Sequence, residues 1–205
     1  MSGVGFEVRS ERGEIVAAVA RVIARHGYER TTVVAIAHEA GTTAAAVRRA
    51  VGEKDDCVFA LFSMTFHQAF AHVLESMRDV PWPQSVRDGL ACLLDLLAAE
   101  PDYVRANVEG IRALGADGGL RLDAAVEAFT AFLAPGYETS AHRTPPLPLP
   151  VFHGHLIGST VVHVISQHVL EDRIEELPQA LPQLLGVALT PFCTASDIDA
   201  LLTAS

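Results

Sequence analysis

The sequence predicts an all-α fold, and two patterns along its 205 residues support this prediction. Apolar residues recur every three or four positions over long stretches, which is the spacing of an amphipathic helix. Gly and Pro residues punctuate these stretches, and no stretch carries a strand pattern long enough to assign. We therefore expect a small N-terminal three-helix unit, residues 1–54, followed by a larger helical domain, residues 55–205.

The stretch from Thr31 to Lys54 carries the pattern of two short helices joined by a tight turn, with a third helix opening at Lys54. Thr31 and Thr32 can cap the first helix, because a hydroxyl there accepts a hydrogen bond from an unpaired backbone N–H. Gly41 suits the left-handed conformation that often ends a helix, and Thr43 can cap the second helix. In this helix-turn-helix arrangement the second helix can lie in the major groove of DNA.

Amphipathic segments on both sides extend the helical pattern. A helix is expected from Arg12 to Gly27, where it would support the helix-turn-helix, and the residues before Arg9 are expected to form a flexible arm. The helix that opens at Lys54 is predicted to end at Pro81, because Pro cannot continue a helix.

The rest of the chain is expected to form further helices. The Gly-rich segment 115–119 is expected to break the pattern, and Pro135–Pro150 to form a surface loop. The last two predicted helices are apolar on more than one side, which indicates burial by a partner subunit and hence a homodimer. The expected helices span residues 84–100, 101–114, 120–133 and 151–171, and the last begins near Leu177.

The net charge of −10 is unevenly distributed. Through Asp56 there are 8 Lys and Arg residues and 8 Asp and Glu residues, so all the excess negative charge lies beyond the helix-turn-helix. This division favours two functions in two regions, since affinity for nucleic acid comes largely from neutralising phosphates.

Cysteine content and hydropathy favour a soluble cytoplasmic protein. Cys57, Cys92 and Cys193 are too few and too widely spaced for a disulfide framework or a metal-binding pair. The N-terminus has no apolar run typical of a signal peptide, and no uninterrupted apolar run approaches the roughly 18 residues that span a bilayer. We therefore expect no membrane partner.

The run from Ile15 to Asp56 resembles the TetR family of transcriptional regulators. The resemblance lies in the order IVAAVARVIARHGYERTTVVAIAHEAGTT, then a short helix, then EKDD; the ending LPQALPQLLGVALTPF from Leu177 is also similar to the last helix of many members. It implies an all-helical, homodimeric repressor that binds a near-palindromic DNA operator. It also implies that a small-molecule effector, bound in the C-terminal domain, releases the DNA.

The same resemblance implies which residues meet DNA. Thr32 and Lys54 take positions that usually contact the phosphate backbone, Thr43 caps the recognition helix, and Ala44, Ala45 and Arg49 take positions that usually face the groove. The chain departs from the family at three positions, with Arg48 in place of a Tyr, Ala50 in place of an aromatic residue or His, and Val51 in place of a Phe. Because Arg can contact both phosphates and guanine edges, we expect base readout to rest on Arg48 and Arg49.

Aromatic residues give the expectation for the effector site. A ligand pocket in a helical domain is lined by such side chains, although core packing explains the same pattern. The pocket would suit a lipophilic or aromatic molecule. Its predicted lining residues are Phe62, Phe66, Phe70, Trp82, Tyr103, Phe129 and His163.

Other function classes lack their motifs. No nucleophile elbow, phosphate-binding Gly loop or dinucleotide fingerprint is present, so we expect neither an enzyme nor a cofactor. The nine histidines have no cysteine or carboxylate at ligand spacing, so we expect no metal site. The alternative hypothesis is a helical small-molecule-binding or dimerisation protein with a decayed DNA-reading surface, because the family's aromatics are missing at Arg48 and Ala50.

Overall fold

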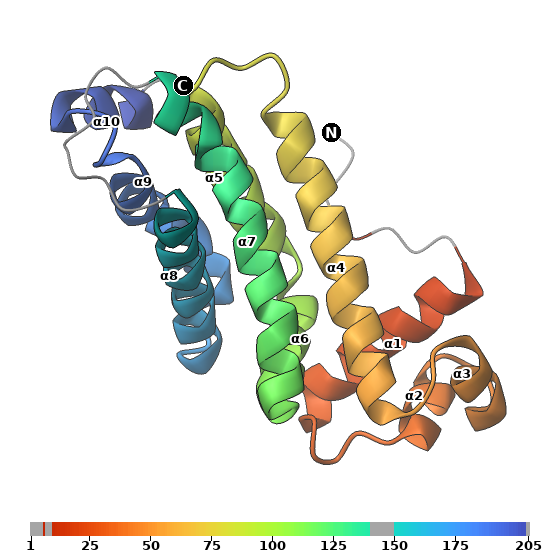
Figure 1. The fold of residues 1–205 in the computed structure, drawn as a ribbon. Helices are drawn as coiled ribbons and strands as arrows, with labels where there is room; N and C mark the ends of the chain where they lie inside the picture. Colours follow the sequence, from red (N-terminus) through yellow and green to blue (C-terminus); the bar gives the residue numbers. More distant parts are fainter. Residues whose placement is uncertain (1–5, 7–9, 140–149, 204–205) are drawn as a thin grey trace. The chain divides into compact units, whose positions relative to one another are not determined.

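The computed structural model describes residue 6, residues 10–139 and residues 150–203. Within these ranges the chain is helical and has no strand, which confirms the predicted all-α fold (Figure 1). Segment η1 is a 3₁₀ helix and all the others are α-helices. They are α1 (Glu11–His26), α2 (Val33–Glu39), α3 (Ala44–Ala50), α4 (Lys54–Ser76), α5 (Gln84–Ala99), α6 (Pro101–Ala113), α7 (Gly115–Thr139), α8 (Pro150–Leu170), η1 (Ile174–Ala180), α9 (Leu181–Leu189) and α10 (Ala195–Thr203).

Contacts between Cα atoms divide the chain into two compact units. The first unit comprises Met1–Phe70 and Ala99–Leu122, and the second comprises Ala71–Ala98 and Asp123–Ser205. Contacts therefore group α6 with the helix-turn-helix. The predicted boundary after residue 54 separates a DNA-binding domain from an effector-binding domain by function, whereas these units are defined by packing. That boundary therefore stays a prediction.

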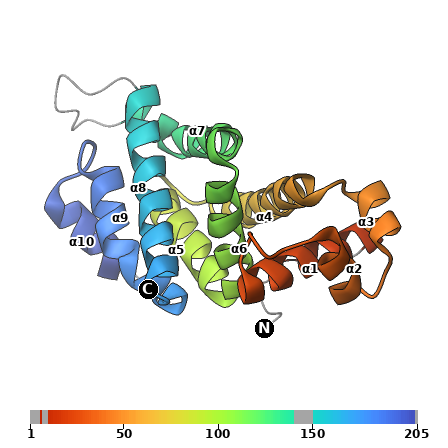
Figure 2. The same cartoon turned by 90° about the horizontal axis from the view of Figure 1, so that it is seen from below.

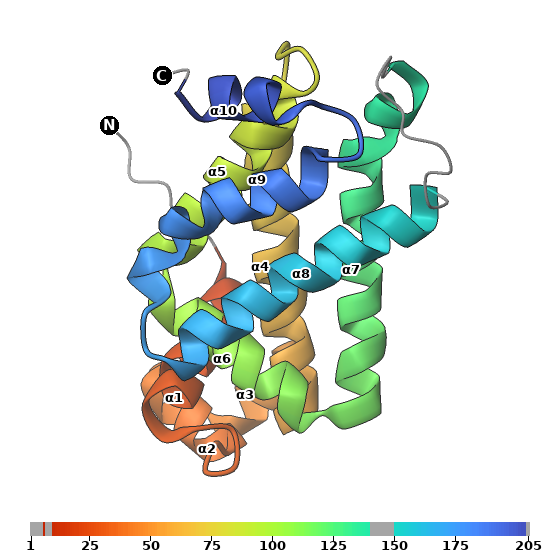
Figure 3. The same cartoon turned by 90° about the vertical axis from the view of Figure 1, so that its left-hand side faces the viewer.

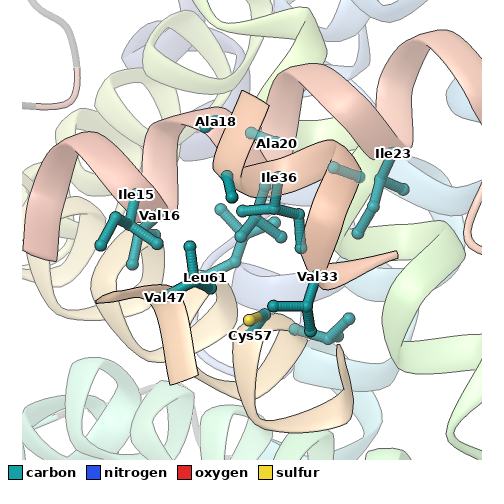
Figure 4. Close-up of a cluster of buried hydrophobic side chains, with 14 of the residues drawn as sticks. Ile15, Val16, Ala18, Ala20, Ile23, Val33, Ile36, Val47, Cys57 and Leu61 are labelled. Atoms are coloured by element: carbon teal, nitrogen blue, oxygen red, sulfur yellow. The ribbon is translucent and has the colours of Figure 1, made fainter. Parts of the chain in front are cut away.

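The core of the first unit holds the helix-turn-helix together. Helices α1, α2 and α3 lie side by side (Figure 2) and bury Ile15, Ile36 and Val47 almost completely. These side chains meet Cys57 and Leu61 of α4 in one cluster (Figure 4). Burying each such aliphatic side chain is worth about 1.5–3 kcal/mol, so this cluster is what fixes α3 on its support.

Phe6 lies against α6, where the sequence predicts a flexible arm. Its side chain is buried, and its ring centroid is 5.0 Å from that of Tyr103. Its backbone N–H donates to Oε1 of Glu100 at 3.3 Å. The arm is thus anchored at this residue, and the other residues before Arg9 lie outside the described ranges.

Two predicted interruptions are shorter than expected. The Gly-rich segment 115–119 breaks the helical pattern only at its start, where α6 ends at Ala113 and Gly115 has φ = 56°, and the segment itself belongs to α7. The reason is packing: a Cβ on Gly118 would lie 2.1 Å from the carbonyl oxygen of Ile111, so glycine here allows a close approach rather than a break. Residues 135–139, predicted as loop, also continue α7, and residues 140–149 lie outside the described ranges.

The second unit contains the C-terminal helices. Helix α8 matches the predicted helix 151–171, and α9 lies beside it (Figure 3). Gly154 and Gly158 allow α8 to approach α7 closely, since a Cβ at these positions would lie 2.8 Å from Cα of Thr130 and 3.2 Å from Cα of Val126. Small residues therefore permit close helix contact at these two positions.

The end of the chain differs from the prediction of one helix from Leu177. Pro178 lies in η1, and α-helix begins only at Leu181, because Pro182 suits a helix's first turn. A further helix, α10, begins after Thr194. The Thr194 backbone N–H donates to Oδ2 of Asp197 at 3.0 Å, and the Asp197 N–H donates to Oγ1 of Thr194 at 3.3 Å. This reciprocal cap is a sequence signal that the prediction missed.

Candidate nucleic-acid interface and effector region

The two helices of the helix-turn-helix begin at the predicted caps. Oγ1 of Thr32 accepts from the Ala35 N–H, and Oγ1 of Thr43 accepts from the Ala46 N–H, both at 3.1 Å. Gly41 has φ = 63°, the left-handed conformation predicted for the turn. Thr31 has another role: its buried hydroxyl donates to the carbonyl of Gly27 at 2.9 Å and ties α2 to the end of α1.

The recognition helix α3 has one buried and one exposed face. Ala46 and Val47 face the core of the first unit, with Val47 fully buried (Figure 4). Ala45, Arg48 and Arg49 are exposed on the opposite side. Since residues four apart share a helix face, Arg48 extends the stripe that begins at Ala44, and Arg49 extends that of Ala45.

Arg48 forms an ion pair on this surface. Its Nε donates to Oε1 of Glu53 at 2.7 Å, and both side chains are exposed. Glu53 lies in the loop between α3 and α4. The residues predicted from sequence do not include this carboxylate, because its approach to Arg48 depends on how the turn at Gly52 folds.

Lys54, the expected phosphate contact, is held at the start of α4 by the loop between α1 and α2. Its Nζ lies 3.8 Å from the centroid of the Tyr28 ring and 3.4 Å from the carbonyl oxygen of Glu29. The Tyr28 hydroxyl donates to Oδ1 of Asp55 at 2.5 Å. Burial, and then the hydrogen bond to Asp55, raise the pKa of Tyr28 to about 12, so the phenol stays neutral.

The other arginines near the motif brace its helices. On α1, Arg21 Nε lies 2.6 Å from Oε1 of Glu39, and Arg25 Nη1 lies 2.8 Å from Oε2 of the same carboxylate. These hydrogen bonds, that of Arg21 first, lower the pKa of Glu39. Both guanidinium groups therefore join α1 to α2.

An apolar cavity lies inside the second unit. Its volume is about 20 Å³, which is room for about one water molecule. On Gly89, a Cβ would lie 2.9 Å from Sδ of Met77, so the flexible thioether packs directly on the glycine backbone. The cavity is lined by Val73, Met77, Val86, Gly89, Leu90, Leu93, Leu133, Ile157 and Ala188.

Comparison with known proteins agrees with this arrangement. The family model "Bacterial regulatory proteins, tetR family" matches residues 15–61, which span α1, the helix-turn-helix and the start of α4. Residues 15–61 thus carry the N-terminal helix-turn-helix domain of the TetR family. No curated protein matches the chain in sequence.

Solved structures of TetR-like regulators share its fold. The fatty acid degradation regulator FadR from Bacillus halodurans is 18% identical with a TM-score of 0.77, over 90% of this chain and 96% of that one. FadR from Bacillus subtilis in complex with stearoyl-CoA is 17% identical with a TM-score of 0.76, over 88% and 98%. A SmeT–triclosan complex is 18% identical with a TM-score of 0.68, over 91% and 93%; SmeT is the repressor of a Stenotrophomonas maltophilia efflux pump.

Three of the aromatic residues predicted for the effector site form a ladder on α4. The rings of Phe62, Phe66 and Phe70 stack in turn, with centroid distances of 6.1 and 5.7 Å, and all three side chains are half-buried. Tyr103 instead packs on Phe6. Burial raises the pKa of its phenol.

The ladder and Tyr103 belong to the first unit, whereas the remaining predicted effector residues belong to the second. The ring of Trp82 meets that of Phe192 at 5.5 Å, and His163 is exposed on α8. The side chain of Phe129 lies outside the described residues. None of the seven predicted residues is among the described residues that line the cavity, so their role in effector binding stays a prediction.

His153 is a buried histidine outside the set of residues predicted for the effector site. It lies on α8 and stacks on Phe192 at 5.3 Å. Burial lowers its pKa, and a backbone hydrogen bond with Val187 partly opposes this effect. Within the described residues no three His, Cys, Asp or Glu side chains gather as metal ligands would.

The three cysteines are free thiols. Burial raises the pKa of Cys57 to about 11, and it also raises the pKa of Cys92 and Cys193. Because the thiolate is the reactive form, none of the three has the character of a redox sensor.

One described helix, α4, is long and apolar enough to cross a membrane by length and composition alone. Core helices of water-soluble proteins pass the same test. The N-terminal half of α4 buries Cys57, Val58 and Leu61 in the core of the first unit.

Proposed function

We propose that this chain is a ligand-responsive transcriptional repressor. In this proposal it binds a near-palindromic DNA operator as a homodimer, and a small lipophilic effector releases it. Such a regulator acts in the cytoplasm and needs no cofactor or membrane. DNA binding, dimerisation and effector binding are each supported by a different region of the chain.

The exposed face of α3 is the observation that carries the proposal. Ala45, Arg48 and Arg49 point away from the core, on a helix capped by Thr43 and anchored by Val47. The two arginines supply donors for phosphates and guanine edges, and the alanine supplies only a methyl contact. Thr32 is exposed at the start of α2 and Lys54 is half-buried at the start of α4, and the hydroxyl and ammonium donors of these residues suit phosphate contacts.

Exposed apolar side chains on α8 and α9 support a homodimer. Phe152, Leu156 and Leu170 of α8 are 61%, 48% and 60% exposed, and Val187 of α9 is 42% exposed. Exposed patches of this kind mark protein interaction sites. A two-fold axis would bury the same residues of both protomers, as in the commonest class of homo-oligomer.

The apolar cavity supports a lipophilic effector. Its walls are aliphatic except for Met77 and Gly89, but at about 20 Å³ it must open to admit a ligand. Regulators of this fold have been solved with stearoyl-CoA and with triclosan. Val73 on the cavity wall and Lys54 at the motif belong to the same helix, α4, which offers a path for coupling. Effector coupling is typically worth about 1–3 kcal/mol.

A mobility-shift assay on DNA selected from random sequence tests the proposal. We expect a sequence-specific complex whose affinity falls steeply with salt and is reduced in Arg48→Ala and Arg49→Ala variants. Absence of any complex at low salt would overturn the proposal. It would favour the second candidate, a ligand-binding or dimerisation protein, which the alanine-rich face of α3 also fits.

A further inference from the structure

The ion pair between Arg48 and Glu53 joins the recognition helix to the loop that follows it. Arg48 Nε lies 2.7 Å from Glu53 Oε1, and the side chains are 50% and 67% exposed. The pair therefore stands at the surface that the proposed function assigns to DNA, and not in the core.

The backbone that carries Glu53 is fixed independently of its side chain. Gly52 has φ = 124°, and a Cβ on this residue would lie 2.4 Å from Oδ2 of Asp56. The backbone N–H of Glu53 donates to the same oxygen at 2.9 Å. This cap on α4 sets the turn, so that the Glu53 carboxylate is presented to Arg48 from a defined position.

We propose that Glu53 is a positioning residue that orients Arg48 to read a guanine in the major groove. This inference rests on the proposed function. A guanidinium has five N–H donors, and Glu53 takes the one on Nε. The end edge of the guanidinium, formed by one N–H of each terminal nitrogen, is then available to donate two parallel hydrogen bonds. That is the geometry of the bidentate contact with guanine O6 and N7.

Glu53 also raises specificity through its charge. A carboxylate close to DNA is repelled by phosphates, so Glu53 weakens binding to every sequence alike. Only a DNA sequence with a guanine opposite Arg48 gains a contact that offsets this repulsion. Repulsion of wrong partners combined with a directed contact to the right one is a general route to specificity. It suits a helix whose exposed face carries, besides the two arginines, only the methyl group of Ala45.

Substitutions at residue 53 test the inference, because Ala and Gln separate the hydrogen bond from the charge. Glu53→Ala removes both, whereas Glu53→Gln removes the charge and keeps an oxygen that accepts from Nε. Glu75→Ala is the matched control, since Glu75 forms an exposed ion pair with Arg78 at 2.5 Å, outside the helix-turn-helix. The readout is base preference at each operator position, measured by selection and sequencing, together with affinity for non-specific DNA.

We expect Arg48→Ala to abolish the preference for guanine at one position per half-site, a preference of about 5- to 150-fold for a bidentate contact. At that position Glu53→Ala should lose about three- to fivefold of the preference, the upper range for an exposed ion pair, and Glu53→Gln should lose less. Both variants at residue 53 should bind non-specific DNA more tightly than the wild type. Glu75→Ala should match the wild type in both readouts.

Three results would overturn the inference while leaving the proposed function intact. Equal losses of preference in Glu53→Ala and Glu53→Gln would mean that only the charge matters. If Glu53→Ala bound the operator more tightly and its base preference were unchanged, Glu53 would only compete with DNA for Arg48. If no operator position changed its base preference in Arg48→Ala, the proposed contact between Arg48 and guanine would not exist. A wild-type protein that selects no sequence would instead overturn the proposed function itself.

Discussion

Leu156 on α8 offers a direct test of the homodimer. Its side chain is 48% exposed, so about half of it is left for a partner to bury. Full burial of a Leu side chain is worth about 1.5–3 kcal/mol, so the exposed half is worth about 1 kcal/mol. A two-fold interface loses this contribution twice, about 2 kcal/mol for Leu156→Ala. We therefore expect the dimer to dissociate roughly 30-fold more readily.

Sedimentation equilibrium over a range of protein concentrations measures this change. Leu74→Ala is the matched control, because Leu74 is 49% exposed on α4, outside the proposed interface. The control should leave the dimer dissociation constant unchanged. An unchanged constant for Leu156→Ala, or an equal shift in both variants, would refute dimerisation through this face of α8.

Three further predictions concern stability. Thr43→Ala removes the cap on α3 and should lower the free energy of unfolding by about 1 kcal/mol in urea titrations, whereas Thr43→Ser should retain most of it. Leu90→Ala enlarges the apolar cavity and should cost about 2–5 kcal/mol; a loss below about 1 kcal/mol would mean that the site collapses. Because its bonds to Arg21 and Arg25 lower the pKa of Glu39 below 4.5, its contribution to stability is present above pH 4.5 and is lost as the pH falls through the lowered pKa. Thermal melts should therefore show Glu39→Gln less stable than wild type at neutral pH, with the difference vanishing in acid; a constant difference would contradict this.

Local signals made the N-terminal part of the fold predictable. A hydroxyl at a helix start, as in Thr32 and Thr43, and a glycine such as Gly41 at a turn, act within a few residues, so the sequence alone reveals them. The cap at Thr194 is equally local and was overlooked.

Glycines whose role depends on distant contacts could not be interpreted this way. From the sequence, Gly118 is expected to break a helix, but in the structure it lets the backbone approach the carbonyl of Ile111 closely. The apolar cavity is similar, since its walls come from helices far apart in the chain and consist of residues typical of any core. Glu53 became visible only when the turn at Gly52 placed it against Arg48.

The buried thiol of Cys57 gives the protein a built-in reporter. Its side chain is fully buried in the core beneath α3 (Figure 4) and is reached by reagents only when that core opens. The rate at which an alkylating agent modifies Cys57, identified by peptide mass, therefore measures how often the helix-turn-helix unfolds locally. If operator DNA binds only the closed unit, saturating DNA slows this modification, and the degree of slowing gives the binding free energy without any label.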